Sequence, residues 1–237
     1  MLDEVLLYEL TDSPFCIKAR ICLNVKGVPF RRVPLTIGRL RELRRLNPRR
    51  QVPVLVDGDA VVADSSAIVR HLESRHPQPS LLPREAEARA YCLLVEEWAD
   101  EALSFLGGAF KWLDPRNRAA AVANTIPELT SGVLRPVVAL AVARSVRRRY
   151  AAWGYKADAI GHLEDRMRGN LDVLAALLGD RPFLLGRTLT LADVAVFAQL
   201  AWMRRYVQRR LLDDAPAVAR WIDRLAAEPA VAAALPA

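Results

Sequence analysis

Apolar positions in the first 76 residues fall into short runs separated by stretches with helical spacing. Residues 5–10, "VLLYEL", predict a short buried strand. The following residues, 14–26, predict a helix that ends at Gly27, a common stop signal. Residues 29–35 predict a second strand, and their two prolines place it at the edge of a sheet.

The same pattern continues with a short helix, a hairpin and a further helix. Residues 39–47 carry leucines at helical spacing, and residues 52–64 predict two strands joined by Asp57-Gly58, a strong hairpin turn. Residues 65–76 predict a helix with one apolar side. The resulting order, βαβαββα, is that of the thioredoxin fold.

Beyond residue 76 the pattern changes from alternating elements to helices. Residues 77–86 are polar and proline-rich, which is typical of a linker between domains. We therefore predict an α+β thioredoxin-like domain over 1–77, a linker over 78–86 and an all-α helical bundle over 87–237. The helical stretches expected there are about 84–112, 115–125, 128–150, 156–178, 190–205 and 215–227.

Charge adds one local feature to this picture. The 237-residue chain has a formal net charge of +7, and residues 31–50 hold eight arginines against the single acid Glu42. This stretch either attracts small anions or an acidic partner, or forms a solvated basic helix face. It lacks interleaved aromatic residues and any nucleic-acid-binding motif, so we expect no nucleic-acid partner.

The cysteines and the apolar runs indicate the environment of the protein. Three cysteines without a pairing framework or metal-ligand spacing fit a reducing compartment and predict no metal site. The N-terminus has acids where a signal peptide carries positive charge. The apolar stretch 133–143 is shorter than the roughly 20 residues of a membrane span. We expect a soluble, cytoplasmic protein without membrane contact.

The motif "SPFC", residues 13–16, lies where the first predicted helix begins. Serine before proline is a common helix start, so capping alone explains Ser13. The same position also favours chemistry, because a helix N-terminus stabilises a thiolate and a serine hydroxyl can donate to one. Cys16, in the first turn, is either a reactive thiol or a small buried residue.

Two further motifs sit at element boundaries. "QVPVL", residues 51–55, opens the third strand, and a cis Val52–Pro53 bond would turn the Val52 backbone toward a peptide-like ligand. "DSSAI", residues 64–68, begins the last helix of the first domain. There Ser65 and nearby amides suit a carboxylate and Asp64 suits an ammonium group, although simple capping explains both residues equally well.

Taken together, these three motifs resemble the glutathione S-transferase superfamily in order and spacing. The linker near residue 80 and the helical second half agree with this resemblance. "LTLADVAVF", residues 189–197, is similar to another feature of the family, in which Thr190 and Asp193 form a capping box with a structural role.

The resemblance implies a glutathione site on the first domain. Ser13 would donate a hydrogen bond to the glutathione thiolate, and Arg39 or Arg50 would meet the glycine carboxylate. The residues implied to bind the rest of glutathione are Phe15, Gln51, Val52, Pro53, Asp64 and Ser65. An apolar electrophile would bind between the domains near Trp98, Phe105, Phe110 and Trp112. The resemblance also implies a homodimer and a role in detoxification.

Two alternatives to this transferase remain open from the sequence. Cys16 would serve a glutathione-dependent thiol transferase or reductase through a one-cysteine mechanism. A non-catalytic binding or scaffold protein would keep the fold without the activity. The long middle of the second domain, residues 113–160, matches no class, and it motivates the second alternative together with the basic segment 31–50.

Overall fold

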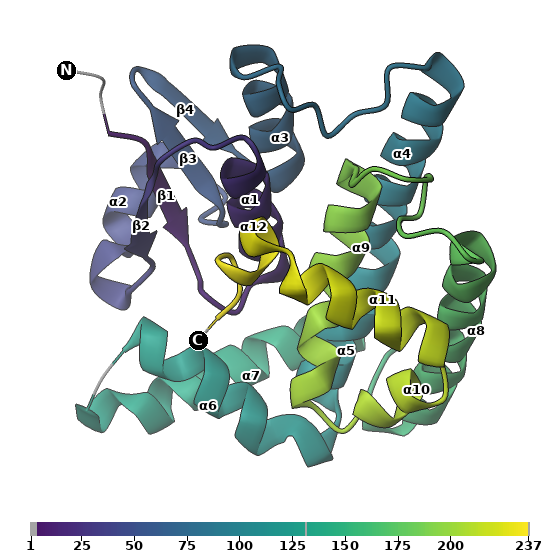
Figure 1. The fold of residues 1–237 in the computed structure, drawn as a ribbon. Coiled ribbons are helices and arrows are strands. Elements are labelled where there is room, and N and C mark those ends of the chain that lie inside the picture. The colour runs from purple at the N-terminus through teal and green to yellow at the C-terminus, as the bar shows by residue number, and fades with distance from the viewer. Residues whose placement is uncertain (1–3, 131, 237) are drawn as a thin grey trace.

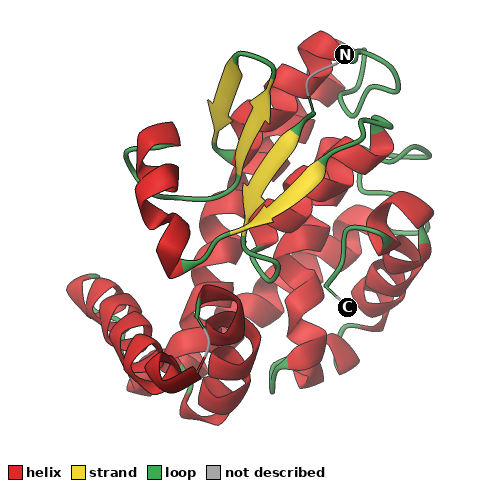
Figure 2. Cartoon of the chain, turned by 90° about the vertical axis from the view of Figure 1, so that its left-hand side faces the viewer, coloured by secondary structure: helices red, strands yellow, loops and turns green. Residues whose placement is uncertain are grey.

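The computed structural model describes residues 4–130 and 132–236 of the chain (Figure 1). The ends of the two predicted domains, residues 1–3 and 237, therefore lie outside the described residues. The first part of the chain forms a four-stranded sheet in the order β2-β1-β3-β4 (Figure 2). Strand β1 pairs in parallel with β2 and antiparallel with β3. The strands are β1 (Leu6–Glu9), β2 (Arg31–Pro34), β3 (Val54–Asp57) and β4 (Ala60–Ala63).

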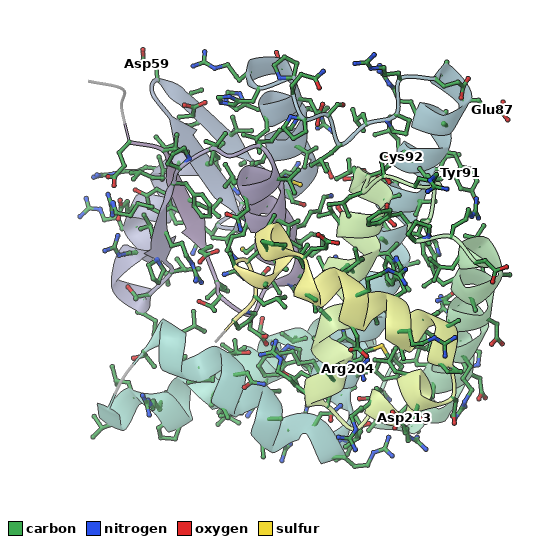
Figure 3. The ribbon with its side chains drawn as sticks, viewed as in Figure 1. Asp59, Glu87, Tyr91, Cys92, Arg204 and Asp213 are labelled. Atoms are coloured by element: carbon green, nitrogen blue, oxygen red, sulfur yellow. The ribbon has the colours of Figure 1, made fainter. Side chains whose placement is uncertain are left out.

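Three helices cover the two faces of this sheet. Because side chains alternate along a strand, Leu7 of β1 joins the core that includes α1 and α3, while the adjacent Tyr8 joins Leu43 of α2 in a separate small core. The predicted edge position of β2 is confirmed, and so is the hairpin, whose tip Figure 3 marks at Asp59. The helices are α1 (Pro14–Val25), α2 (Leu40–Leu46) and α3 (Ser65–Arg75).

The remainder of the chain is helical, so the predicted fold class is confirmed. Helix α9 lies at its centre and is buried along its whole length against α1, α4 and α5 (Figure 1). The helices are α4 (Ala86–Trp98), α5 (Ser104–Leu113), α6 (Arg118–Leu129), α7 (Arg135–Ala152), α8 (Ile160–Leu178), α9 (Leu191–Leu200), α10 (Arg209–Asp213), α11 (Pro216–Ala227) and α12 (Pro229–Ala232).

Several helices differ from the sequence prediction. Helix α7 begins at Arg135, whereas the prediction began at residue 128, and α10 was not predicted. The single helix expected over 84–112 is interrupted by a π-helical turn, Ala99–Leu103, between α4 and α5. The last helix predicted, 215–227, is followed by α12, which packs against α1 through a 2.8 Å hydrogen bond from Asn24 Nδ2 to the Ala230 carbonyl. The C-terminal end of the chain thus returns to the first domain.

The stretch within 113–160 that matched no class packs against α5. Tyr150, Trp153 and Tyr155 surround the ring of Phe105, with ring centroids 5.0–5.8 Å away. The Tyr150 hydroxyl also donates to the Phe105 carbonyl at 2.9 Å. A side chain at Gly108 would clash with this hydroxyl, because a Cβ there would lie 2.3 Å from it. The segment therefore supports α5 from outside.

The capping box at the start of α9 is confirmed. The Asp193 carboxylate accepts from the Thr190 amide at 3.0 Å and from the Leu184 amide at 2.7 Å, so it fixes both the helix end and the preceding loop. Among the helices of the described residues, none is both long and apolar enough to cross a membrane.

A buried cation joins the first helix to the second domain. Lys18 of α1 is fully buried and pairs with Glu96 and with Asp100, the latter at 2.6 Å. Its Nζ also donates to Ser66 of α3 at 3.1 Å. Burial lowers the pKa of Lys18, but its two carboxylate partners outweigh burial and leave the pKa raised, so the lysine stays charged.

Replacing Lys18 by methionine leaves the buried Glu96 and the largely buried Asp100 without their cation. We expect Lys18→Met to lower the free energy of unfolding by about 3–5 kcal/mol, measured by urea denaturation. Lys156→Met, which removes an exposed lysine, serves as the matched control and should change it little. Equal stability of the two variants would show that the buried cation does not hold the domains together.

Candidate functional site

Two cavities meet where β1 leads into α1. The larger has a volume of about 900 Å³ and the smaller about 280 Å³. Leu10, Ser13 and Phe15 line both of them. The segment between β1 and the first turn of α1 therefore forms the wall that the two cavities share, and among these three residues Ser13 carries the hydroxyl group.

The larger cavity has a polar lining with charges of both signs. Its basic residues are Arg49, Arg50 and Arg70, and its acidic residues are Asp64, Glu97, Asp100 and Glu101. The acids Glu97, Asp100 and Glu101 come from the end of α4 and the π-helical turn. A ligand that carries both ammonium and carboxylate groups finds partners for each in this cavity.

Ser13 is the N-cap residue of α1. Its backbone is extended, and its carbonyl accepts the first helical hydrogen bond from the Ile17 amide at 2.9 Å. Within the described residues, its hydroxyl makes no capping hydrogen bond to the helix, so the capping role predicted for this side chain is wrong. The helix amides of the first turn are thus left for another acceptor.

The loop before β3 presents backbone groups to the larger cavity. The Val52–Pro53 bond is cis. No hydrogen bond recorded among residues 4–130 and 132–236 uses the Val52 backbone. Asn47 holds the loop in shape, because its Nδ2 donates to the Gln51 carbonyl at 2.9 Å and its Oδ1 accepts from the Arg49 amide at 3.1 Å.

The start of α3 contributes a buried hydroxyl. Ser65 is 2% exposed, and its Oγ has no hydrogen-bond partner among the described residues although the side chain lines the larger cavity. The preceding Asp64 has a φ of 87°, a left-handed value that is costly for a residue other than glycine. Its carboxylate caps α3 by accepting from the Ala67 amide at 3.0 Å.

The smaller cavity is mainly apolar. Trp202 forms part of its wall and lies against Gly107, where a Cβ would come within 3.0 Å of the indole nitrogen. The cavity lining is Leu10, Asp12, Ser13, Pro14, Phe15, Ser104, Gly107, Gly108, Lys111, Trp112, Thr125, Gln199 and Trp202.

Comparison with known protein families identifies the family to which this fold and site belong. Residues 7–80 match the family model for the glutathione S-transferase N-terminal domain, and residues 139–224 match the model for the glutathione S-transferase C-terminal domain. The chain belongs to the glutathione S-transferase superfamily.

Individual members of this superfamily match the chain to different extents. Glutathione S-transferase U17 of Arabidopsis thaliana is 26% identical over 99% of this chain and 91% of its own length. Glutathione S-transferase Z1 of the same plant is 35% identical over 37% of this chain. Three curated relatives with 35–42% identity are matched over only about two fifths of their own length.

Solved structures share the whole fold. The crystal structure of rice glutathione S-transferase GST1 in complex with glutathione has a TM-score of 0.71 and is 25% identical. That comparison covers 99% of this chain and 91% of the rice protein. The similarity therefore extends across both the sheet and the helices.

The sequence predicts eight site residues, and seven of them line the larger cavity of this glutathione S-transferase family member. These are Ser13, Phe15, Gln51, Val52, Pro53, Asp64 and Ser65. Of the two arginines considered for a carboxylate, Arg50 lines the cavity, whereas Arg39 lies 3.9 Å from Glu42 and outside the lining.

Cys16 is the eighth predicted residue, and it does not reach either cavity. Its side chain is fully buried, and burial raises the pKa of its thiol to about 12, although the Leu10 backbone and the Ser13 hydroxyl act in the opposite direction. Lys18 and Arg20, the cations nearest in sequence, pair with acids elsewhere. The burial of Cys16 weighs against its reactive role and agrees with the alternative of a small packed residue.

Of the four aromatic residues predicted to line the electrophile site, only Trp112 lines the smaller cavity. Phe110 is fully buried in the core, and Phe105 packs against Tyr150 of α7. Trp202 and Lys111 are among the cavity residues that the sequence reasoning missed. The adjacent glycines 107 and 108 offered a signal, because glycine pairs inside a helix usually mark a close approach.

The burial of Cys16 has a direct chemical consequence. Because the thiolate is the reactive form, we expect the native protein to gain no adduct with iodoacetamide at pH 8, while the urea-unfolded chain gains three. Intact-mass spectrometry measures both results. A single adduct in the native protein that peptide mapping places on Cys16 would contradict the buried assignment.

Proposed function

We propose that this protein is a glutathione transferase that joins the glutathione sulfur to an apolar electrophile. The observation that carries the proposal is the position of Ser13 between a polar cavity suited to a peptide and an apolar cavity suited to an electrophile. A thiolate beside Ser13 would lie next to both substrates.

The lining of the larger cavity offers a partner for each polar group of glutathione. The unpartnered Ser65 hydroxyl would donate to the γ-glutamyl carboxylate, and the acids at the end of α4 would meet its ammonium group. The Val52 backbone would pair with the cysteinyl part. Arg49 and Arg50 would attract the glycine carboxylate, which gives part of the arginine-rich stretch a role in binding an anion.

Ser13 would hold the sulfur in its ionised form. Its hydroxyl would donate to the thiolate, and the N-terminal end of α1 would add a partial positive charge. The thiol proton leaves to solvent when the thiolate forms. The sulfur then forms a bond to the electrophilic carbon, and the leaving group departs with the electron pair of the bond that breaks.

Removing the Ser13 hydroxyl tests this assignment. We expect Ser13→Ala to lower kcat/KM for 1-chloro-2,4-dinitrobenzene by about a hundredfold, the effect of losing one donor to a reacting anion. Cys16→Ala is the matched control in the same helix turn and should retain most of the activity if it folds normally. Unchanged turnover by Ser13→Ala, or loss confined to Cys16→Ala, would contradict the assignment.

The role of Ser65 is tested by binding alone. We expect Ser65→Ala to weaken glutathione binding about tenfold by calorimetry, because one hydrogen bond to a carboxylate is lost. Ser66→Ala is unsuitable as a control because Ser66 contacts Lys18, so exposed Ser145→Ala serves instead. Equal affinities for glutathione in all three proteins would remove Ser65 from the site.

Members of the superfamily differ in the reaction they catalyse, so the type of reaction has to be measured for this protein. Maleylpyruvate isomerase of Ralstonia sp. is 38% identical over 35% of this chain, so isomerisation by the same thiolate is the second candidate. A chain that binds no glutathione would instead fit the non-catalytic alternative. A homodimer and a detoxification role, both implied by the family resemblance, and a cytoplasmic location, expected from the composition, remain predictions.

A further inference from the structure

Beside the smaller cavity, two cations share one carboxylate. Lys111 Nζ of α5 lies 2.6 Å from Asp12 Oδ2, and Arg205 pairs with Asp12 Oδ1. The Asp12 side chain is only 8% exposed. This group of Asp12, Lys111 and Arg205, the Asp12 cluster, therefore carries one net positive charge directly before Ser13.

Only part of the Asp12 cluster faces the cavity. Asp12 and Lys111 are the charged residues among those that line it, and Arg205 is not part of the lining. Both Asp12 oxygens already accept from cations. The Lys111 ammonium has three N–H groups, and its recorded hydrogen bond within the described residues uses one of them. Lys111 thus retains donors for a ligand.

The rest of the wall is shaped for a flat apolar body. Trp202, Trp112 and Phe15 line the cavity together with Gly107 and Gly108 of α5, and Trp202 packs directly over Gly107. Thr125 adds a polar group to this wall. Its buried Oγ1 has no hydrogen-bond partner in the described part of the chain and is therefore available to a ligand. A planar ring surrounded by aromatic residues would present its substituents to Lys111 or Thr125.

We propose that the preferred electrophile of this site is an aromatic acid, whose carboxylate binds Lys111 while its ring lies in the apolar cavity. The inference rests on the proposed transferase function and adds a substrate class to it. Arg205 acts as a positioning residue, because it occupies one oxygen of Asp12 and so leaves Lys111 with charge that Asp12 does not neutralise.

A matched pair of electrophiles tests the substrate class. 4-Chloro-3-nitrobenzoate and 4-chloro-3-nitrobenzamide differ in charge at nearly equal size, and both react by loss of chloride as the sulfur bonds to the ring. After correction for the rates without enzyme, we expect kcat/KM to favour the benzoate about tenfold, as one charge-assisted hydrogen bond would give. A preference for the benzamide, or none, would overturn the proposal.

Variants assign the preference to the Asp12 cluster. Lys111→Met should abolish the benzoate preference, and Arg205→Met should reduce it because Asp12 then neutralises Lys111. Lys156→Met, an exposed control, should keep it. A preference that persists in Lys111→Met would overturn the role of this lysine and show that the cluster only holds the domains together.

A binding measurement separates this inference from the proposed function. S-(4-Carboxybenzyl)glutathione should bind about tenfold more tightly than S-benzylglutathione by calorimetry, and Lys111→Met should remove the difference. If both bind equally well, the transferase site stands and the substrate class is wrong. If neither binds, the proposed function fails and this inference fails with it.

Discussion

The buried ion group around Lys18 is the interaction on which the site geometry depends. It fixes α1 against α4 and α3 at a point little more than one turn beyond Ser13. A charge buried without its partners is strongly destabilising, so the three elements have one favourable arrangement relative to one another. The position of Ser13 relative to the second domain follows from that arrangement.

The continuous path of α4, the π-helical turn and α5 serves both cavities. Glu97, Asp100 and Glu101 line the larger cavity, and the following positions Ser104 and Lys111 line the smaller one. π-helical turns occur often at functional sites because they shift the side-chain register within a helix. Here the turn lies where the lining changes from acidic to apolar. A single helical path thus supplies partners for a polar and an apolar ligand side by side.

Much of the fold and of the larger cavity was predictable because its signals are local. Proline at a strand start, serine at a helix start and Asp57-Gly58 at a turn each act within a few residues. The sequence left both a buried and a reactive Cys16 open, since its position in the first turn does not determine which side of the helix meets the core. Trp202 and Lys111 reach the site from the second domain, so only long-range packing places them there.

The stabilisation of a thiolate by Ser13 is the central claim, and the ultraviolet absorbance of the thiolate measures it most directly. Titration of bound glutathione should give a thiol pKa at least about one unit below the ordinary value of about 8.5. In Ser13→Ala the pKa of the bound thiol should return toward that ordinary value. A bound thiol with an ordinary pKa in the unmodified protein, or a lowered pKa that Ser13→Ala leaves unchanged, would contradict the account.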